Sequence, residues 1–117
     1  ALAQAKQQHP NARACPDYEE LIGLPELDAV VICLPSQLHA EAAAKAFAAG
    51  RHVYLEKPAA LDLPSALTLE SAWKSSGKVG MMGFNYRWHP LAGDLRQQIR
   101  LQTVGTLVSG RSSFCSG

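Results

Sequence analysis

The chain has 117 residues, with 47% hydrophobic and 18% charged side chains and a formal net charge of +1, an ordinary composition for a soluble globular protein. This length allows one modest domain with a hydrophobic core. No basic block suggests nucleic acid as a partner, and the longest apolar run, DAVVICLP, is too short to span a membrane.

Strand and helix signals alternate along the first part of the chain. Residues 28–35 are apolar throughout and rich in β-branched side chains, which predicts a strand buried on both faces of a parallel sheet. Ser36 is the expected N-cap of an alanine-rich helix over 38–49, and Gly50 ends that helix. The flanking segments are expected to be the end of a helix at 1–9, a helical turn at 18–24 and a strand at 52–55.

A second cycle follows. Asp62 is expected to cap a helix over 63–76 that Gly77 ends, and VGMMG is the expected third strand. FNYRWHP is predicted to be a loop and LAGDLRQQIRLQ a further helix. After Gly105, TLVSGRSSF alternates in polarity, which predicts a strand with one face in water and indicates a different sheet.

The three cysteines, Cys15, Cys33 and Cys115, are widely spaced and form no CxxC pair, so no metal site is expected. Cys33 lies within an apolar run and is expected to be a small core residue. This usage fits a reducing compartment, and a cytoplasmic location is expected. The start at Ala1 leaves an exported form open.

Helical crossovers make the three strands parallel, so their carboxyl ends share one edge of the sheet, where open α/β sheets bind ligands. Three segments bring polar residues to this edge. They are Pro35, Ser36 and His39 after the first strand, Glu56, Lys57 and Pro58 after the second, and Phe84, Asn85, Tyr86 and Arg87 after the third.

Each of these residues also has a purely structural interpretation. Ser36 can serve only as an N-cap, and His39 can be a solvated or core-edge histidine as well as a ligand. Glu56 and Lys57 can form a surface ion pair that contributes little, and Arg87 can stack on a neighbouring ring. The residues alone leave both interpretations open.

The order of these motifs carries a resemblance. DAVVICLPSQLHAEAAAKAFAAGRHVYLEKPAALDLPSAL, continued by GKVGMMGFNYRWHPLAGDLRQQI and GTLVSGRSSF, resembles the Gfo/Idh/MocA oxidoreductases over nearly the whole chain. The resemblance implies an α/β fold. Residues 1–103 are then the C-terminal part of a Rossmann-type parallel sheet domain whose first strands lie outside the chain. Residues 104–117 are the first strand of a second, truncated α/β domain that binds substrate.

The resemblance also implies roles for individual residues. Lys57 matches the catalytic lysine beside the nicotinamide and the reacting carbon of an NAD or NADP cofactor. The residues that match cofactor-binding positions are Leu34, Pro35, Ser36, His39, Glu56, Lys57, Pro58, Asn85 and Arg87. Pro58 shapes its turn, and a Lys–Pro bond allows the cis form. The match of Asn85 and Arg87 is the looser one.

By this resemblance, the full-length protein transfers a hydride between NAD(P) and a secondary alcohol of a sugar, inositol or related polyhydroxy compound. The alternatives are an NAD-dependent glycosidase of the same fold and a non-catalytic relative that senses a nucleotide or sugar. A homo-oligomer is expected, with no nucleic-acid or membrane partner. Residues 1–117 alone are expected to be inactive, and the proton acceptor is expected beyond Gly117.

Overall fold

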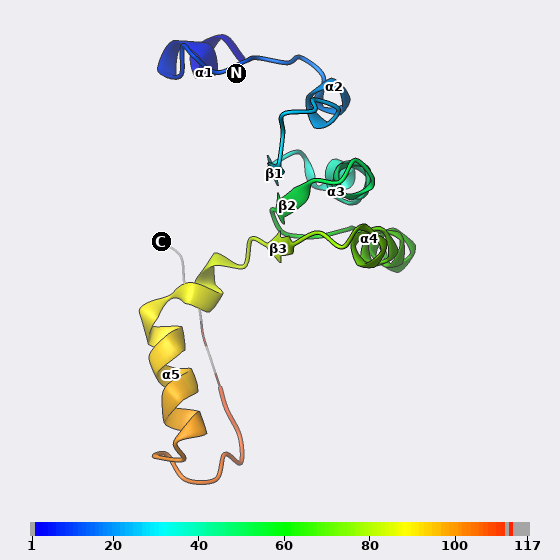
Figure 1. Ribbon diagram of the computed structural model, residues 1–117. Coiled ribbons are helices and arrows are strands. Elements are labelled where there is room, and N and C mark those ends of the chain that lie inside the picture. Colours follow the sequence, from blue (N-terminus) through cyan, green and yellow to red (C-terminus); the bar gives the residue numbers. More distant parts are fainter. Residues whose placement is uncertain (1, 112, 114–117) are drawn as a thin grey trace. The chain divides into compact units, whose positions relative to one another are not determined.

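The computed structural model describes residues 2–111 and 113. The chain divides into two compact units after Gly83, and each is described by itself (Figure 1). The elements of the first unit are α1 (Leu2–Gln8), α2 (Tyr18–Ile22), β1 (Ala29–Ile32), α3 (His39–Ala48), β2 (His52–Leu55), α4 (Leu63–Ser76) and β3 (Gly80–Met82). The second unit contains α5 (Pro90–Arg100). A Rossmann-type α/β fold is therefore confirmed for the strand–helix part of the chain.

The three strands form one parallel sheet in the order β1-β2-β3. The register pairs Ile32 with Leu55 and Leu55 with Met82, so the last residues of the three strands lie side by side. The parallel arrangement expected from the sequence is thus confirmed, and the carboxyl ends of the strands share one edge.

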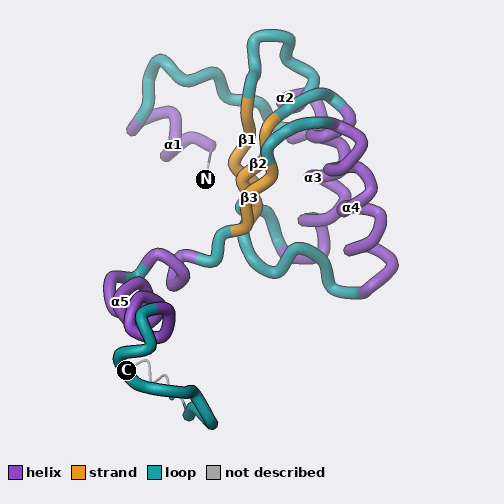
Figure 2. Tube along the Cα trace, turned by 60° about the horizontal axis from the view of Figure 1, so that its bottom comes forward, coloured by secondary structure: helices purple, strands orange, loops and turns teal. Residues whose placement is uncertain are grey.

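Helices α3 and α4 lie next to each other along one face of this sheet (Figure 2). Their ends follow the expected chemistry. Gly50 and Gly77 have φ values of 76° and 64°, a left-handed conformation that glycine adopts without steric cost. The Asp62 carboxylate accepts a hydrogen bond from the Ser65 N–H at 2.7 Å, which caps α4 and lowers the pKa of Asp62.

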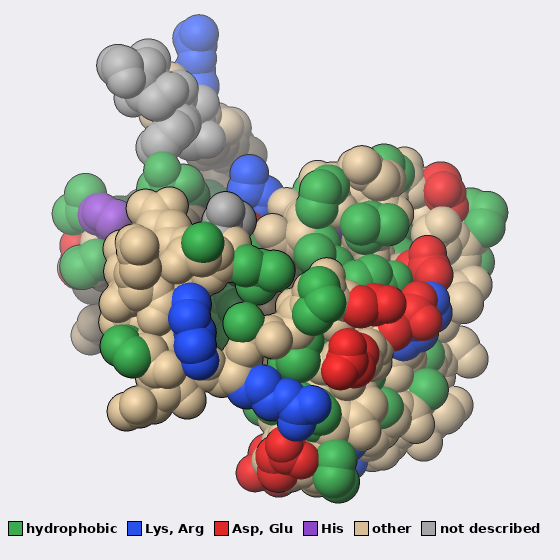
Figure 3. Space-filling model, turned by 90° about the horizontal axis from the view of Figure 1, so that it is seen from above, with side chains coloured by type: hydrophobic (Ala, Val, Ile, Leu, Met, Phe, Trp, Pro, Cys, Tyr) green, Lys and Arg blue, Asp and Glu red, His purple; other side chains and the backbone are tan. Residues whose placement is uncertain are grey.

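The opposite face of the sheet stays open, which corrects two expectations. Val31 is 71% exposed and Cys33 is exposed, so β1 is not buried on both faces and Cys33 is not a core residue. The reason is the alternation of side chains along a strand: Ile32 points to the helices and its neighbours point away. The view from above in Figure 3 shows hydrophobic side chains, in green, at the surface among charged ones.

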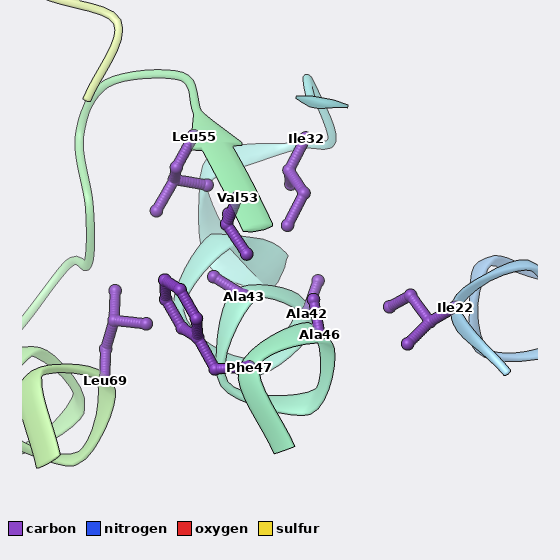
Figure 4. Packing of buried hydrophobic residues seen from close by; sticks show 9 residues of the cluster. All are labelled: Ile22, Ile32, Ala42, Ala43, Ala46, Phe47, Val53, Leu55 and Leu69. Atoms are coloured by element: carbon purple, nitrogen blue, oxygen red, sulfur yellow. The ribbon is translucent and has the colours of Figure 1, made fainter. Parts of the chain in front are cut away.

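The core lies between the sheet and the helices (Figure 4). Ala42, Ala43 and Ala46 have no exposed area, so α3 approaches the strands closely. Phe47 fills the space beside them. The buried apolar residues are Ile22, Ile32, Ala42, Ala43, Ala46, Phe47, Val53, Leu55 and Leu69.

Arg51 ties the segment before β1 to the end of α3. Its guanidinium donates hydrogen bonds to the carbonyl oxygens of Ile22, Leu24 and Leu27, at 3.2, 2.9 and 2.6 Å. On the outer side of α3, Lys45 donates to Glu19 and Glu41, and these two hydrogen bonds raise the pKa of Lys45. Together these contacts fix α2 and the segment after it against α3 and the start of β2.

The second unit is mainly α5, which follows a short 3-10 turn over Asn85–Trp88 in the segment predicted as a loop. The strand expected at 106–114 is not found at 106–111 or 113, and its remaining residues lie outside the described part of the chain. An isolated strand is not stable without a partner to pair with. The assignment of 1–103 and 104–117 to two domains stays a prediction.

Candidate functional site

The segments after β1, β2 and β3 leave the sheet together. The Glu56 N–H donates to the Ile32 carbonyl at 3.0 Å, and the Gly83 N–H donates to the Leu55 carbonyl at 2.8 Å. Hydrogen bonding thus continues one residue past β2 and β3. This brings the residues that follow β1 and β2 to the same edge as Gly83.

The turn after β1 differs from the expected cap. Ser36 begins a 3-10 turn over Ser36–Leu38, and the N-cap of α3 is Leu38, not Ser36. The Leu38 N–H instead donates to the Pro35 carbonyl at 2.9 Å. A backbone carbonyl therefore closes the first turn, which leaves the half-buried Ser36 hydroxyl without a capping role.

His39 connects two of the segments. Its side chain is buried, at 2% exposure. Nδ1 lies 2.7 Å from the Pro58 carbonyl oxygen, and Nε2 lies 2.7 Å from the Leu34 carbonyl oxygen. Both polar atoms of the ring are therefore engaged with the backbone, one on the loop after β1 and one on the loop after β2.

Glu56 and Lys57 lie between these contacts. Glu56 Oε2 accepts a hydrogen bond from the Lys57 backbone N–H at 3.0 Å, whereas the two side chains form no ion pair with each other. The Lys57 side chain is exposed, and among the described residues its ammonium has no ion-pair partner. The Lys57–Pro58 peptide bond is cis.

Sequence reasoning missed two residues of this edge, Gly83 and Tyr54. A Cβ at position 83 would lie 2.8 Å from Glu56 Oε1 and 3.2 Å from the Tyr54 hydroxyl oxygen. The buried backbone of Gly83 therefore packs directly against the Glu56 carboxylate. A glycine directly after the third strand was the available signal, since close backbone approach requires the missing side chain.

Asn85 and Arg87 belong to the second unit, whereas the other predicted site residues belong to the first. Asn85 Oδ1 accepts from the Tyr86 N–H at 2.8 Å, and the Arg87 carbonyl accepts from Arg96 at 3.5 Å. These contacts are local to the turn and to α5. The cofactor-binding roles of Asn85 and Arg87 stay predictions.

A cavity of about 300 Å³ lies elsewhere in the first unit, between α4 and the β2–β3 side of the sheet. Its lining is mainly apolar and includes Leu69, Trp73 and Met81 but neither Glu56 nor Lys57. Within the described part of the chain, no three His, Cys, Asp or Glu side chains are grouped as metal ligands. Of the helices described, none is long and apolar enough to cross a membrane.

The edge just described is where a parallel α/β sheet binds a nucleotide. The profile of the Gfo/Idh/MocA oxidoreductases, described as an oxidoreductase family with an NAD-binding Rossmann fold, matches residues 1–84. The chain belongs to this family. The family's fold is an NAD-binding one, and an NADP⁺ complex is among the similar structures described next.

Two curated relatives and two solved structures illustrate the similarity. Levoglucosan dehydrogenase of Pseudarthrobacter phenanthrenivorans is 30% identical over 96% of this chain and 29% of its own. The scyllo-inositol 2-dehydrogenase (NAD(+)) of Bacillus subtilis is 29% identical over 76% of this chain and 26% of its own. An NAD binding oxidoreductase from Klebsiella pneumoniae has a TM-score of 0.82 at 33% identity, covering 89% of this chain and 28% of its own. Biliverdin reductase from Synechocystis sp. PCC 6803, in complex with biliverdin and NADP⁺, has a TM-score of 0.75 at 28% identity, covering 85% and 31%.

The chain spans less than a third of the length of each of these proteins. The family profile ends at residue 84, close to the boundary of the first compact unit at Gly83. Family membership therefore describes the sheet and its carboxyl edge most directly.

Proposed function

We propose that the full-length protein transfers a hydride between NAD(P) and a secondary alcohol of a sugar, inositol or related polyhydroxy compound. The observation that carries the proposal is the exposed Lys57, two residues after the end of β2, at the carboxyl edge of a parallel sheet in an NAD-binding family. The substrate class is supported by relatives whose names include levoglucosan and scyllo-inositol dehydrogenases.

The residues at this edge fit the polar parts of a dinucleotide. The turn of Leu34, Pro35 and Ser36 presents backbone groups and one hydroxyl without a capping role, which suits a ribose. Glu56 keeps Oε1 outside its bond to the Lys57 N–H, and a carboxylate oxygen accepts hydrogen bonds from hydroxyls and amides. When bound, the nicotinamide supplies the hydride chemistry, and these residues hold and orient it.

In this proposal, Lys57 acts on the substrate oxygen. Oxidation of a secondary alcohol removes a hydroxyl proton and builds negative charge on the oxygen. An ammonium beside that oxygen stabilises the charge, and because it is not held in an ion pair with a described residue, it is available to the substrate. Pro58 follows Lys57 directly and fixes the direction in which the chain leaves the site.

The test is Lys57→Ala in the full-length protein, with NAD⁺ and NADP⁺ and a panel of polyols and sugars. We expect kcat to fall by about 100-fold or more with little change in cofactor affinity, since a donor to the developing charge is lost. Lys57→Arg should not restore turnover, because the guanidinium is larger and planar and does not place its charge where the compact ammonium does. Turnover within a few-fold of the unaltered protein in Lys57→Ala contradicts the role.

The same assay separates the proposal from its alternatives. Net reduction of NAD(P)⁺ in step with substrate oxidation supports a dehydrogenase. Glycoside cleavage without net reduction points to the glycosidase of the same fold. Nucleotide or sugar binding without turnover, in a protein indifferent to Lys57→Ala, points to a sensing relative. Size measurement of the full-length protein tests the proposed homo-oligomer.

A further inference from the structure

We propose that His39 is a positioning residue, which sets the place of Glu56 and Lys57 by holding the loops after β1 and β2 at a fixed separation. The inference rests on the proposed function of this edge and extends it to a residue that does not touch the reacting atoms. The sequence predicts that His39 contacts the cofactor directly, whereas in this proposal His39 acts on the cofactor site only through the two loops.

The first argument is where the ring nitrogens point. Nδ1 meets the carbonyl oxygen of Pro58, the residue directly after Lys57, and Nε2 meets that of Leu34, two residues after the end of β1, each at 2.7 Å. With 2% exposure, the ring has no room for water to replace either partner. No other polar ring atom is left to contact a ligand.

The second argument is what holds the ring itself. His39 is the first residue of α3, whose alanines 42, 43 and 46 are fully buried against the sheet. Because α3 is packed against the sheet, the Cα of His39 has a fixed position, and the ring holds both loops at a fixed distance from the helix. Glu56 in turn bonds the Lys57 N–H at 3.0 Å, which ties the pair to the loop that His39 holds.

The third argument is the choice of side chain. Both partners are carbonyl oxygens, which only accept hydrogen bonds, and they lie on opposite sides of one small ring. A neutral imidazole donates to one of them, and both contacts are hydrogen bonds when each ring nitrogen carries a proton. Histidine is the side chain that presents nitrogen atoms in both directions. Asparagine places an N–H₂ near the position of Nδ1 and glutamine places one near Nε2, so each reproduces one of the two contacts.

The experiment compares His39→Phe, His39→Asn and His39→Gln in the full-length protein, well below the lowest melting temperature. Phenylalanine keeps the ring but removes both nitrogens. We expect His39→Phe to lower kcat by about 10-fold or more, since misplacing reacting groups by about 1 Å costs on the order of 100-fold. His39→Asn should recover more of kcat than His39→Gln, because it keeps the contact next to Lys57.

Phe47→Leu is the matched control, since it alters a buried ring on the same helix that contacts neither loop carbonyl. It should lower the melting temperature and leave kcat unchanged. If His39→Phe behaves in the same way, with kcat and KM within two-fold of the unaltered protein, the positioning role is wrong. If His39→Phe does not fold, equal kcat values for the Asn and Gln variants overturn the inference.

Failure of the proposed function is recognised separately, by Lys57→Ala with unaltered turnover. In that case the inference is judged by NAD(P)H affinity, measured by fluorescence titration. His39→Phe should then weaken binding about five-fold or more, while Phe47→Leu does not. Unchanged affinity in His39→Phe contradicts the role of His39 whatever the chemistry of the protein.

Discussion

Replacing Gly83 with alanine tests how closely the end of β3 controls Glu56. The added Cβ would lie 2.8 Å from Glu56 Oε1 and 3.0 Å from Glu56 Cδ, whereas ordinary contact begins at 3.4 Å. The carboxylate must therefore move by more than half an ångström. Because it also accepts from the Lys57 N–H, its displacement weakens or breaks that hydrogen bond.

The expected effect falls on binding more than on stability. Alanine at a glycine of ordinary φ stabilises by about 0.4–1 kcal/mol through the unfolded chain, and loss of one net hydrogen bond costs about 1 kcal/mol. The free energy of unfolding should therefore change by less than about 1 kcal/mol. A shift of this size in a positioned group should weaken NAD(P)H binding by roughly 10-fold, equivalent to about 1.4 kcal/mol.

The control is Gly80→Ala, at the first residue of β3 and three residues before Gly83. Its Cβ would lie 3.0 Å from Phe47 Cζ and 3.2 Å from Trp73 Cδ1, so it crowds the core rather than the site. Overpacking of this kind costs about 1–3 kcal/mol, and cofactor affinity should not change. Fluorescence titration with NAD(P)H and thermal unfolding by circular dichroism measure the two quantities in the full-length protein.

Two results would refute this reasoning. In the first, Gly83→Ala binds NAD(P)H as tightly as the unaltered protein, which means that the position of the Glu56 carboxylate does not matter for binding. In the second, affinity falls only in proportion to a loss of stability that Gly80→Ala shares. The reasoning requires Gly83→Ala to lose NAD(P)H affinity with little loss of stability, and Gly80→Ala to lose stability with unchanged affinity.

Two further predictions concern stability. The Ser65 N–H lowers the pKa of Asp62 in the folded protein below its ordinary value of 3.8. The charged cap therefore stabilises the fold at pH values above 3.8, and this contribution is lost as the pH falls through the lowered pKa of the folded state. The difference in melting temperature between the unaltered protein and Asp62→Ala should therefore shrink below pH 3.8. The melting temperature of Asp62→Asn, which keeps an acceptor, should lie between those of the other two. A difference that does not depend on pH counts against the charged cap. Arg51→Met should lower the free energy of unfolding by about 2 kcal/mol, because three carbonyls lose a charged donor, and Arg51→Lys should recover part of it in denaturant titration.

The sequence predicts the elements whose signals are local. Gly50 and Gly77 end α3 and α4 as expected, and Asp62 caps α4 with the expected bond to the backbone. These rules involve residues only a few positions apart. The parallel order of the strands followed from the crossovers, and it is confirmed.

What the sequence did not predict depends on distant partners. Cys33 is expected in the core but is exposed. Its burial depends on what covers the second face of β1, which the apolar composition of the strand does not reveal. Ser36 has the right chemistry for a cap, yet a backbone carbonyl takes that place. The bond between His39 and Pro58 joins residues 19 positions apart and has no local signal.

Small side chains on α3 bear on more than the core. Three buried alanines set how near that helix lies to the sheet, and the same helix carries the ring that spans the two loops. A methyl group added on the buried side of α3 would lift the helix and, with it, the imidazole. A substitution at one of these three alanines is thus also a change in the geometry of the edge that His39 holds together.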